Sequence, residues 1–204
     1  MTWSNVPDGR CLHLAWMPTQ RYPDMPFEQQ MNFPTELTLH STPNGLRAYR
    51  IPVREISNLY DQYDRWKNKT ITAGNNILNK LKGDLYDMQF EFDMTRSSSF
   101  TIGIRGANIY YDADKQQIFC DGPTVDNKWA DLGRATLKSI DGKMKLRILV
   151  DRTSIEIFGN DGEVVITSNF MPDLLNRFYS LSTDKQIKIV SADIYSLKSI
   201  WNIN

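Results

Sequence analysis

Residues 88–94 read Met88-Gln89-Phe90-Glu91-Phe92-Asp93-Met94, and every second side chain in this stretch is large and apolar. A β-strand points alternate side chains to opposite faces, so the pattern predicts a strand with four apolar side chains in a core. The intervening Gln89, Glu91 and Asp93 are expected to meet water. Such half-buried strands are typical of antiparallel sheets.

The same alternation recurs further along the chain, at residues 146–150 and 155–157. Gly159-Asn160-Asp161-Gly162 predicts a tight turn into a strand at 164–167, which makes a hairpin. Asp141-Gly142 predicts another turn. Further short strands are expected at 99–104, 109–111, 117–120 and 187–195. Short strands separated by polar turns every 8–12 residues or so predict an antiparallel sandwich or barrel.

Two regions depart from this rhythm. Residues 54–63 have a helical pattern, with Ile56, Leu59 and Tyr60 on one side, and predict a short helix. Residues 1–53 are rich in proline and contain two strand-like pieces, 11–17 and 37–41, joined by a long loop. A loop of that length is usually functional or packed against something else.

The overall composition excludes several classes of protein. The 204 residues include 24 Lys and Arg and 24 Asp and Glu, so the formal net charge is zero. This balance argues against a nucleic-acid partner and gives no reason to expect binding to an anionic membrane. The first ten residues are polar and do not read as a signal peptide, and no apolar run approaches the roughly 20 residues that span a bilayer. We therefore expect a soluble chain with no membrane partner.

No metal site or cofactor is predicted. His13 and His40, the only histidines, have no Cys, Asp or Glu at ligand spacing. Cys11 and Cys120 show no metal or redox spacing, and a disulfide between them is the less favoured alternative to two free thiols. Serine elbows, phosphate loops and zinc patterns are also absent from the sequence.

Four acidic residues are candidates for catalytic groups. Glu91 and Asp93 lie on one face of a strand, about 6–7 Å apart, which is near the range of a carboxylate pair. Any solvent-facing strand shows the same spacing, so we favour a structural interpretation. Asp151 and Glu156 are better explained by turn formation and cross-strand pairing. We therefore expect no catalytic residue among them.

Large aromatic residues offer a candidate binding surface. Tyr110, Tyr111, Trp66 and Trp129 could form a carbohydrate platform, because aromatic rings stack well on neutral sugars. The alternative is that they fill the space between two sheets or cover an edge. We favour this alternative because no regular spacing marks an exposed row.

Four stretches carry a family resemblance. They are Asn5 to Met17, with Asn5-Val6-Pro7-Asp8-Gly9-Arg10 and Leu14-Ala15-Trp16-Met17; Met25 to Leu39; Gly45 to Ile56; and Asp151 to Gly162. In this order they resemble the last propeller blade, its next strand, the exit from the propeller and the signature sandwich hairpin of glycoside hydrolase family 32. That family includes invertases, levanases and inulinases.

The resemblance implies an all-β chain, an antiparallel two-sheet β-sandwich preceded by a partial β-propeller blade. Residues 1–53 would be the remnant of the last blade with its linker, and residues 54–204 the C-terminal sandwich. The family's retaining chemistry uses two carboxylates. They belong to Asn-Asp-Pro and Glu-Cys motifs, with a stabilising Asp in Arg-Asp-Pro, and this sequence contains none of the three. Only Trp16 is carried over, as the match of a Trp that lines the fructosyl pocket; its alternative is a core aromatic.

The leading hypothesis is therefore the C-terminal, non-catalytic portion of a β-fructosidase-type enzyme, bracing the catalytic domain. Its intact parent would act on fructan or sucrose-type carbohydrate and would be secreted or periplasmic. The alternatives are a stand-alone carbohydrate-binding module and a purely structural or dimerisation domain. Unpaired strand edges in residues 1–53 also predict self-association.

Overall fold

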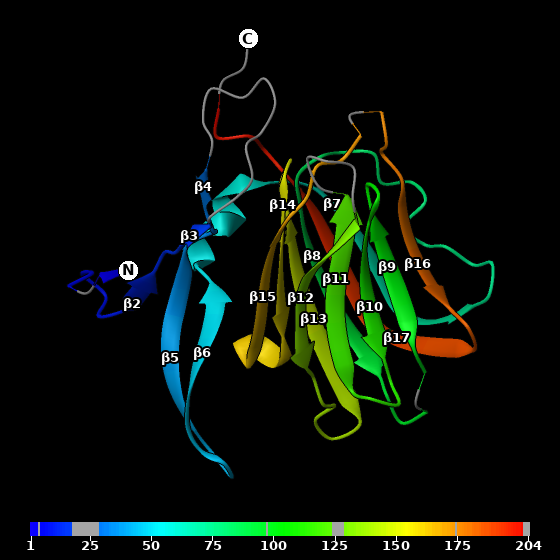
Figure 1. The fold of residues 1–204 in the computed structure, drawn as a ribbon, viewed down its shortest axis with the longest axis horizontal. Coiled ribbons are helices and arrows are strands. Elements are labelled where there is room, and N and C mark those ends of the chain that lie inside the picture. Colours follow the sequence, from blue (N-terminus) through cyan, green and yellow to red (C-terminus); the bar gives the residue numbers. More distant parts are fainter. Residues whose placement is uncertain (4, 18–28, 97, 124–128, 174, 202–204) are drawn as a thin grey trace.

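The computed structural model describes residues 1–3, 5–17, 29–96, 98–123, 129–173 and 175–201, with the backbone alone at 129–132. All the paired strands are antiparallel, so the predicted all-β class is confirmed. Figure 1 shows a sandwich beside a separate, elongated sheet built by the first part of the chain.

That first sheet has four strands in the order β1-β2-β5-β6 and stands where the partial blade was expected. Its strands are β1 (Thr2–Trp3), β2 (Cys11–His13), β5 (Thr35–Thr42) and β6 (Gly45–Pro52). A two-stranded ribbon lies next to it, made of β3 (Trp16–Met17) and β4 (Gln30–Met31).

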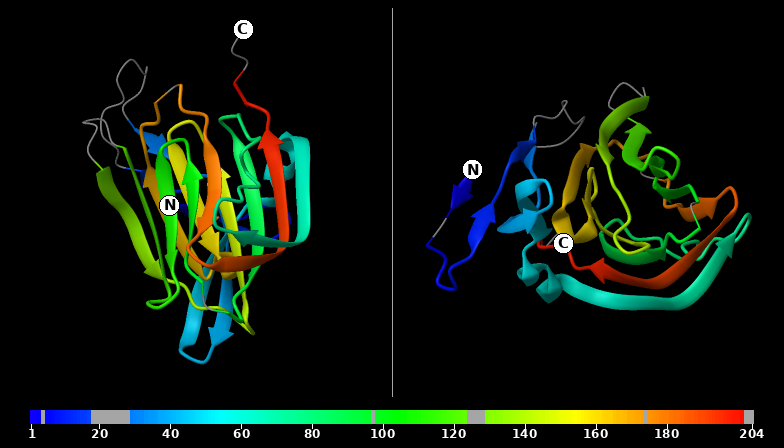
Figure 2. Two further views of the ribbon diagram at one scale, coloured as in Figure 1. Left: turned by 90° about the vertical axis from the view of Figure 1, so that its right-hand side faces the viewer. Right: turned by 90° about the horizontal axis from the view of Figure 1, so that it is seen from below.

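The predicted two-sheet sandwich follows, and Figure 2 shows its two layers from below. One sheet has the order β15-β14-β13-β8-β17-β7, with β15 (Val164–Asn169), β14 (Ser154–Gly159), β13 (Lys143–Val150), β8 (Tyr86–Asp93), β17 (Gln186–Leu197) and β7 (Tyr60–Thr72). The other has the order β12-β11-β10-β9-β16, with β12 (Trp129–Thr136), β11 (Gln117–Pro123), β10 (Ala107–Asp112), β9 (Phe100–Ile104) and β16 (Tyr179–Thr183).

The alternation in β8 produces the core as predicted. Met88, Phe90 and Phe92 are at most 3% exposed, and Met94 packs at the edge of the same cluster. The ring of Phe92 stacks on Phe100 of the opposite sheet at 4.6 Å. The largest cluster of buried side chains therefore lies between the two sheets.

The predicted hairpin at residues 159–162 is also confirmed. Its turn is a short 3₁₀ segment, η2 (Asn160–Gly162), which connects β14 to β15. Asn160 and Asp161 adopt positive φ angles of 47° and 57°, which Asn and Asp tolerate better than most residues. The Nδ2 of Asn160 donates to the carbonyl of Lys138 at 2.7 Å and holds the turn in place.

The helix predicted for residues 54–63 is only partly right. A 3₁₀ segment, η1 (Arg54–Leu59), buries Ile56, and β7 begins at the next residue. Tyr60 is extended because β7 pairs along β17, starting opposite Leu197. Tertiary pairing thus overrides the local helical pattern.

No disulfide joins Cys11 to Cys120. Across the residues described above, no helix is long and apolar enough to cross a membrane.

Candidate functional site

Trp16 lies on β3 and is an exposed residue, 57% accessible. Its indole Nε1 donates to Oε1 of Gln29 at 2.7 Å, so the ring is oriented by a polar neighbour. The structure therefore places Trp16 on the surface and not in the core.

The two neighbouring tyrosines of the predicted platform point in opposite directions. Tyr111 is 3% exposed in the sandwich core, where it stacks on Phe100 and donates to the carbonyl of Leu137 at 3.3 Å. Tyr110 faces outward, and its ring stacks on Phe119 of β11 at 4.8 Å. Because successive strand residues alternate, the two tyrosines cannot share one surface.

Trp66 lies on the other sheet from Tyr110, and the side chain of Trp129 cannot be placed with either. Trp66 lies on β7, partly buried against the core, with Nζ of Lys80 at 4.9 Å from its ring centroid. Trp129 belongs to β12, and its side chain lies outside the described residues.

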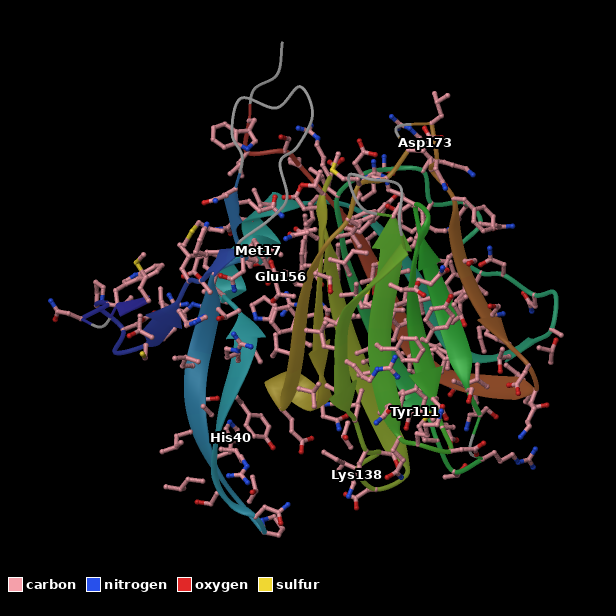
Figure 3. All side chains as sticks on the ribbon, in the orientation of Figure 1. Met17, His40, Tyr111, Lys138, Glu156 and Asp173 are labelled. Atoms are coloured by element: carbon pink, nitrogen blue, oxygen red, sulfur yellow. The ribbon has the colours of Figure 1, made fainter. Side chains whose placement is uncertain are left out.

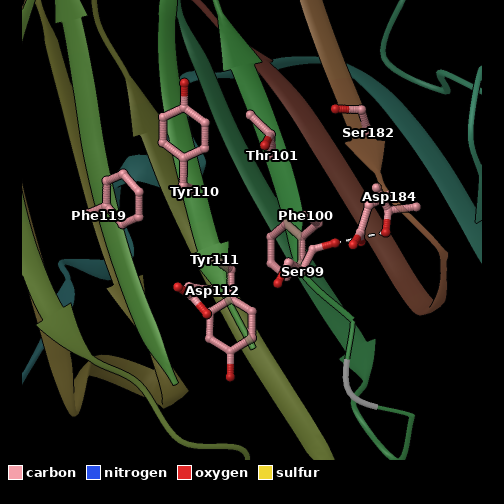
Figure 4. A pocket seen from close by; sticks show the side chains of 10 residues that line it. Ser99, Phe100, Thr101, Tyr110, Tyr111, Asp112, Phe119, Ser182 and Asp184 are labelled. Atoms are coloured by element: carbon pink, nitrogen blue, oxygen red, sulfur yellow. Dashed lines mark hydrogen bonds between the residues drawn. The ribbon is translucent and has the colours of Figure 1, made fainter. Parts of the chain in front are cut away.

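A pocket of about 300 Å³ lies beside Tyr110 on the five-stranded sheet. Figure 4 shows Tyr110 and Phe119 together on one side and the short side chains of Thr101 and Ser182 on the other. Asp112 and Asp184 also line the pocket, with Asp184 next to Ser182 in this view. This volume is at the low end of ligand pockets.

The outward carboxylates of β8 are held in ion pairs. Glu91 lies 2.8 Å from Nζ of Lys143, and Asp93 lies 3.1 Å from Nζ of Lys188. Hydrogen bonds from Thr95, together with Lys188, lower the pKa of Asp93 to about 2. A carboxyl that ionises so readily is a poor proton donor near neutral pH, which supports the structural interpretation of this pair.

Glu156 is more deeply buried than its place on a hairpin suggests. It is 3% exposed, and burial raises its pKa to about 7. Its Oε1 accepts the backbone N–H of Phe33 at 2.6 Å, while Oε2 has no hydrogen-bond partner. Figure 3 shows Glu156 on the side of the sandwich that faces β5 and β6. Asp151, by contrast, accepts the N–H of Arg152 at 2.7 Å, as expected for a turn residue.

Glu156 belongs to an interface between residues 1–53 and the outer face of the six-stranded sheet. Gln30 bridges the two parts, because its Nε2 donates to Asn169 at 2.8 Å and its Oε1 accepts from Thr153 at 3.1 Å. Phe33 packs against a second apolar cluster of the sandwich part, formed by Ile56, Leu149 and Phe158, with Tyr60, Val165 and Leu197 around it.

A buried ion pair that the sequence did not reveal lies on the same outer face. Asp87 is fully buried, and the guanidinium of Arg147 binds it through Nε at 3.0 Å and Nη2 at 2.7 Å. The hydroxyl of Tyr60 donates a third hydrogen bond to this carboxylate at 2.7 Å. The alternation of β8 predicted that this face meets water, whereas Tyr60 and Arg147 cover it at Asp87.

Among the described residues, no three His, Cys, Asp or Glu side chains are placed to hold a metal ion.

Comparison with known sequences gives a consistent result. Residues 55–196 match the family described as glycosyl hydrolases family 32, C terminal. A levanase of Bacillus subtilis is 34% identical over an alignment that covers 98% of this chain and 33% of the levanase. A levanase of Bacillus sp. strain L7 is 31% identical over 98% of this chain and 24% of the relative. The chain thus spans about a third or less of the length of these relatives.

Solved structures share the fold at lower identity. The exo-inulinase of Aspergillus awamori superposes with a TM-score of 0.77 at 23% identity, covering 94% of this chain and 41% of the inulinase. The β-fructofuranosidase of Schwanniomyces occidentalis, complexed with fructosyl-erythritol, gives a TM-score of 0.80 at 22% identity, covering 98% and 47%. Both likenesses support the same β-sandwich architecture.

Proposed function

The chain belongs to glycosyl hydrolase family 32, and from this premise we propose that it is the non-catalytic C-terminal portion of a β-fructosidase-type enzyme. Its role there is to brace the catalytic domain. The names of its relatives, levanase and exo-inulinase, indicate fructan or sucrose-type carbohydrate as the substrate of the intact parent. The extracellular exo-inulinase among them supports a secreted or periplasmic parent.

The observation that carries this proposal is the interface between residues 1–53 and the sandwich, the two parts into which we divide the chain. It combines the packing of Phe33 against the apolar cluster around Ile56 with the hydrogen bond from the Phe33 N–H to Glu156. Buried polar contacts of this kind fix one relative orientation, because misplacing them leaves polar groups unpaired. A sandwich held in this way can stabilise the sheet to which it is attached.

A non-catalytic role is supported by the state of the acidic residues. Retaining glycosidases need two carboxyl groups about 5–5.5 Å apart, one of which carries a proton. Glu91 and Asp93 are neutralised by lysines, and Glu156 is enclosed at the interface. None of the family's catalytic motifs occurs in the sequence.

We expect the purified chain to release no fructose from levan, inulin or sucrose. An enzymatic fructose assay over a day, at pH 5 and pH 7, measures this. Fructose production by the pure chain that disappears in the Glu156→Gln variant would contradict the proposal and assign catalysis to the interface carboxyl. Fructose production unchanged in that variant would contradict the proposal without locating the catalytic group.

Trp16 is proposed to contribute to sugar binding in the intact parent. Its exposed ring can stack on a sugar, and its bond to Gln29 orients it. The residues that would complete such a pocket belong to the other blades implied by the family resemblance.

Self-association is proposed as well, through the edge strand β6. Within the described part of the chain β6 pairs with β5 alone. Leu39 and Leu46 are 69% and 61% exposed on one face of this hairpin. Free strand edges and exposed apolar residues recruit partners, and a second copy of the same hairpin is the partner proposed here.

A further inference from the structure

A single row of side chains crosses the whole outer face of the five-stranded sheet. The strand register aligns Arg134 opposite Phe119, Phe119 opposite Tyr110, Tyr110 opposite Thr101, and Thr101 opposite Ser182. The row therefore contains one residue from each strand. With strands about 4.8 Å apart, its four intervals span about 19 Å.

The row faces away from the sandwich core. Each of Thr101, Tyr110 and Phe119 has an adjacent isoleucine in its own strand. These neighbours are Ile102, Ile109 and Ile118, and all three are fully buried between the sheets. Alternation then places the row on the opposite surface.

The pocket arises from a step in side-chain height along this row. One ring face of Phe119 is covered by the guanidinium of Arg134, 4.3 Å from the ring centroid, and the other by Tyr110. Tyr110 has Phe119 on one side only. On its other side the row continues with the short side chains of Thr101 and Ser182, which form the floor beneath its free ring face (Figure 4).

The polar groups of the pocket are available to a ligand. The side chains of Thr101, Ser182 and Asp184 make no hydrogen bond or ion pair with any described residue. Asp112 is held by Nζ of Lys115 at 3.1 Å and by two backbone N–H groups. The pocket thus offers two hydroxyls and one free carboxylate beside an aromatic ring.

These groups select for a neutral, hydroxyl-rich ligand. Among the described residues that line the pocket there is no Lys or Arg, so an anion would meet the Asp184 carboxylate without a cation beside it. A carboxylate accepts strong hydrogen bonds from hydroxyl groups, and an aromatic ring packs against the C–H face of a sugar. Lys115 neutralises Asp112, so Asp184 is left as the single uncompensated charge of the pocket. One exposed carboxylate attracts a cation only weakly.

We propose that this row is a binding site for a neutral oligosaccharide, with Tyr110 stacked on one sugar ring and Thr101, Ser182 and Asp184 bound to its hydroxyls. The site would give the sandwich a ligand of its own, which goes beyond the bracing role. Only the choice of fructo-oligosaccharides as the first probes rests on that proposed function.

The test is a calorimetric titration of the whole chain with levan-type and inulin-type tetrasaccharides, and with maltotetraose as a comparator. Saturable heat with unchanged sugar is expected. Tyr110→Ala should weaken binding about two- to tenfold, since an aromatic stacking contact contributes about 0.5–1.5 kcal/mol. Thr101→Leu should abolish binding by filling the floor of the pocket.

Tyr195→Ala is the matched control. Tyr195 stacks on Tyr60 at 3.9 Å on the six-stranded sheet, so the variant removes a stacked tyrosine remote from the pocket. It should bind sugar like the unmodified chain. Circular dichroism and the melting temperature establish that each variant is folded.

The outcomes separate the claims. Binding that survives both Tyr110→Ala and Thr101→Leu would overturn the assignment to this row, while leaving carbohydrate binding elsewhere on the chain. No binding of any of the three sugars by the unmodified chain would overturn the proposal altogether. Neither result bears on the bracing function, which the stability of the interface variants tests separately.

Discussion

At the level of single residues, Glu156 shows how a conventional strand position can become an interface residue. Its side chain points away from the sandwich core, as alternation requires, yet the chain around Phe33 covers it. Burial disfavours the ionised form and raises the pKa of Glu156 from 4.5 to about 7, against the opposing effect of the Phe33 N–H and the nearby charge of Arg50.

This shift predicts a specific pH dependence of stability. A carboxyl with a raised pKa stabilises the fold below the unfolded value of about 4.5, and this contribution is lost as pH rises through about 7. Glu156→Gln stays neutral and can still accept the Phe33 N–H. The free energy of unfolding of the variant, relative to that of the unmodified chain, should therefore increase by up to about 3 kcal/mol as the pH rises from 4.5 to 8.

Urea unfolding at pH 5, 6, 7 and 8 measures this difference. Glu55→Gln is the control, because hydrogen bonding to Arg10 lowers the pKa of Glu55 to about 2. Titration of Glu55 therefore changes the stability only below about pH 4.5. The difference in free energy of unfolding between Glu55→Gln and the unmodified chain should stay constant from pH 5 to pH 8. Parallel pH curves for Glu156→Gln and the unmodified chain would rule out the interpretation.

At the level of elements, the turn η2 couples the hairpin β14–β15 to strand β6. A Cβ on Gly162 would clash with the backbone carbonyl of Arg50, and the φ of Gly162 is 93°. Gly45 has a similar φ of 91°, but a Cβ there would meet nothing within 4 Å. An alanine at Gly45 would therefore test backbone strain alone, whereas an alanine at Gly162 would add the steric contact with Arg50 across the interface.

Gly45→Ala should cost about 1–2 kcal/mol, the usual penalty for a side chain in the left-handed region. Gly162→Ala should cost about 1–3 kcal/mol more, because the added methyl group forces η2 away from β6. Denaturant unfolding of both variants measures the difference. Equal destabilisation by the two substitutions would mean that the contact with Arg50 relaxes freely, which would weaken the bracing proposal.

At the level of the whole molecule, the β5–β6 hairpin leaves an edge and two leucines exposed. Light scattering should show a concentration-dependent dimer, and Leu39→Lys with Leu46→Lys should shift it to monomer. Ile140→Lys is the control, because Ile140 is 53% exposed on the sandwich, away from this hairpin. A monomer at all concentrations, or a dimer lost equally in the control, would contradict association through β6.

Much of the architecture follows from short-range patterns. Alternation in residues 88–94 determines a strand with an inward face, and the turn residues at 159–162 determine a hairpin. The helical pattern at 54–63 failed at Tyr60, because pairing with β17 stabilises an extended chain more than local spacing favours a helix. A pattern over a few residues indicates the local periodicity, but it does not indicate which distant strand will pair with the segment.

The candidate sites depend on contacts between distant parts of the sequence. Tyr110 and Tyr111 are adjacent aromatics, and only the packing of two sheets decided that Tyr111 is internal. Phe119, Thr101 and Ser182 join Tyr110 through strand register, which no single strand encodes.

The sequence by itself thus determined the all-β class, the order of the strands along the chain and the family resemblance, because alternation, turns and motifs are properties of neighbouring residues. Tertiary structure alone decided which outward faces are covered. Glu156 is buried by a segment 123 residues away, and the free ring face of Tyr110 exists because its neighbours in space are small. Burial of a strand's second face depends on what packs against it, and that partner is set by the fold of the entire chain.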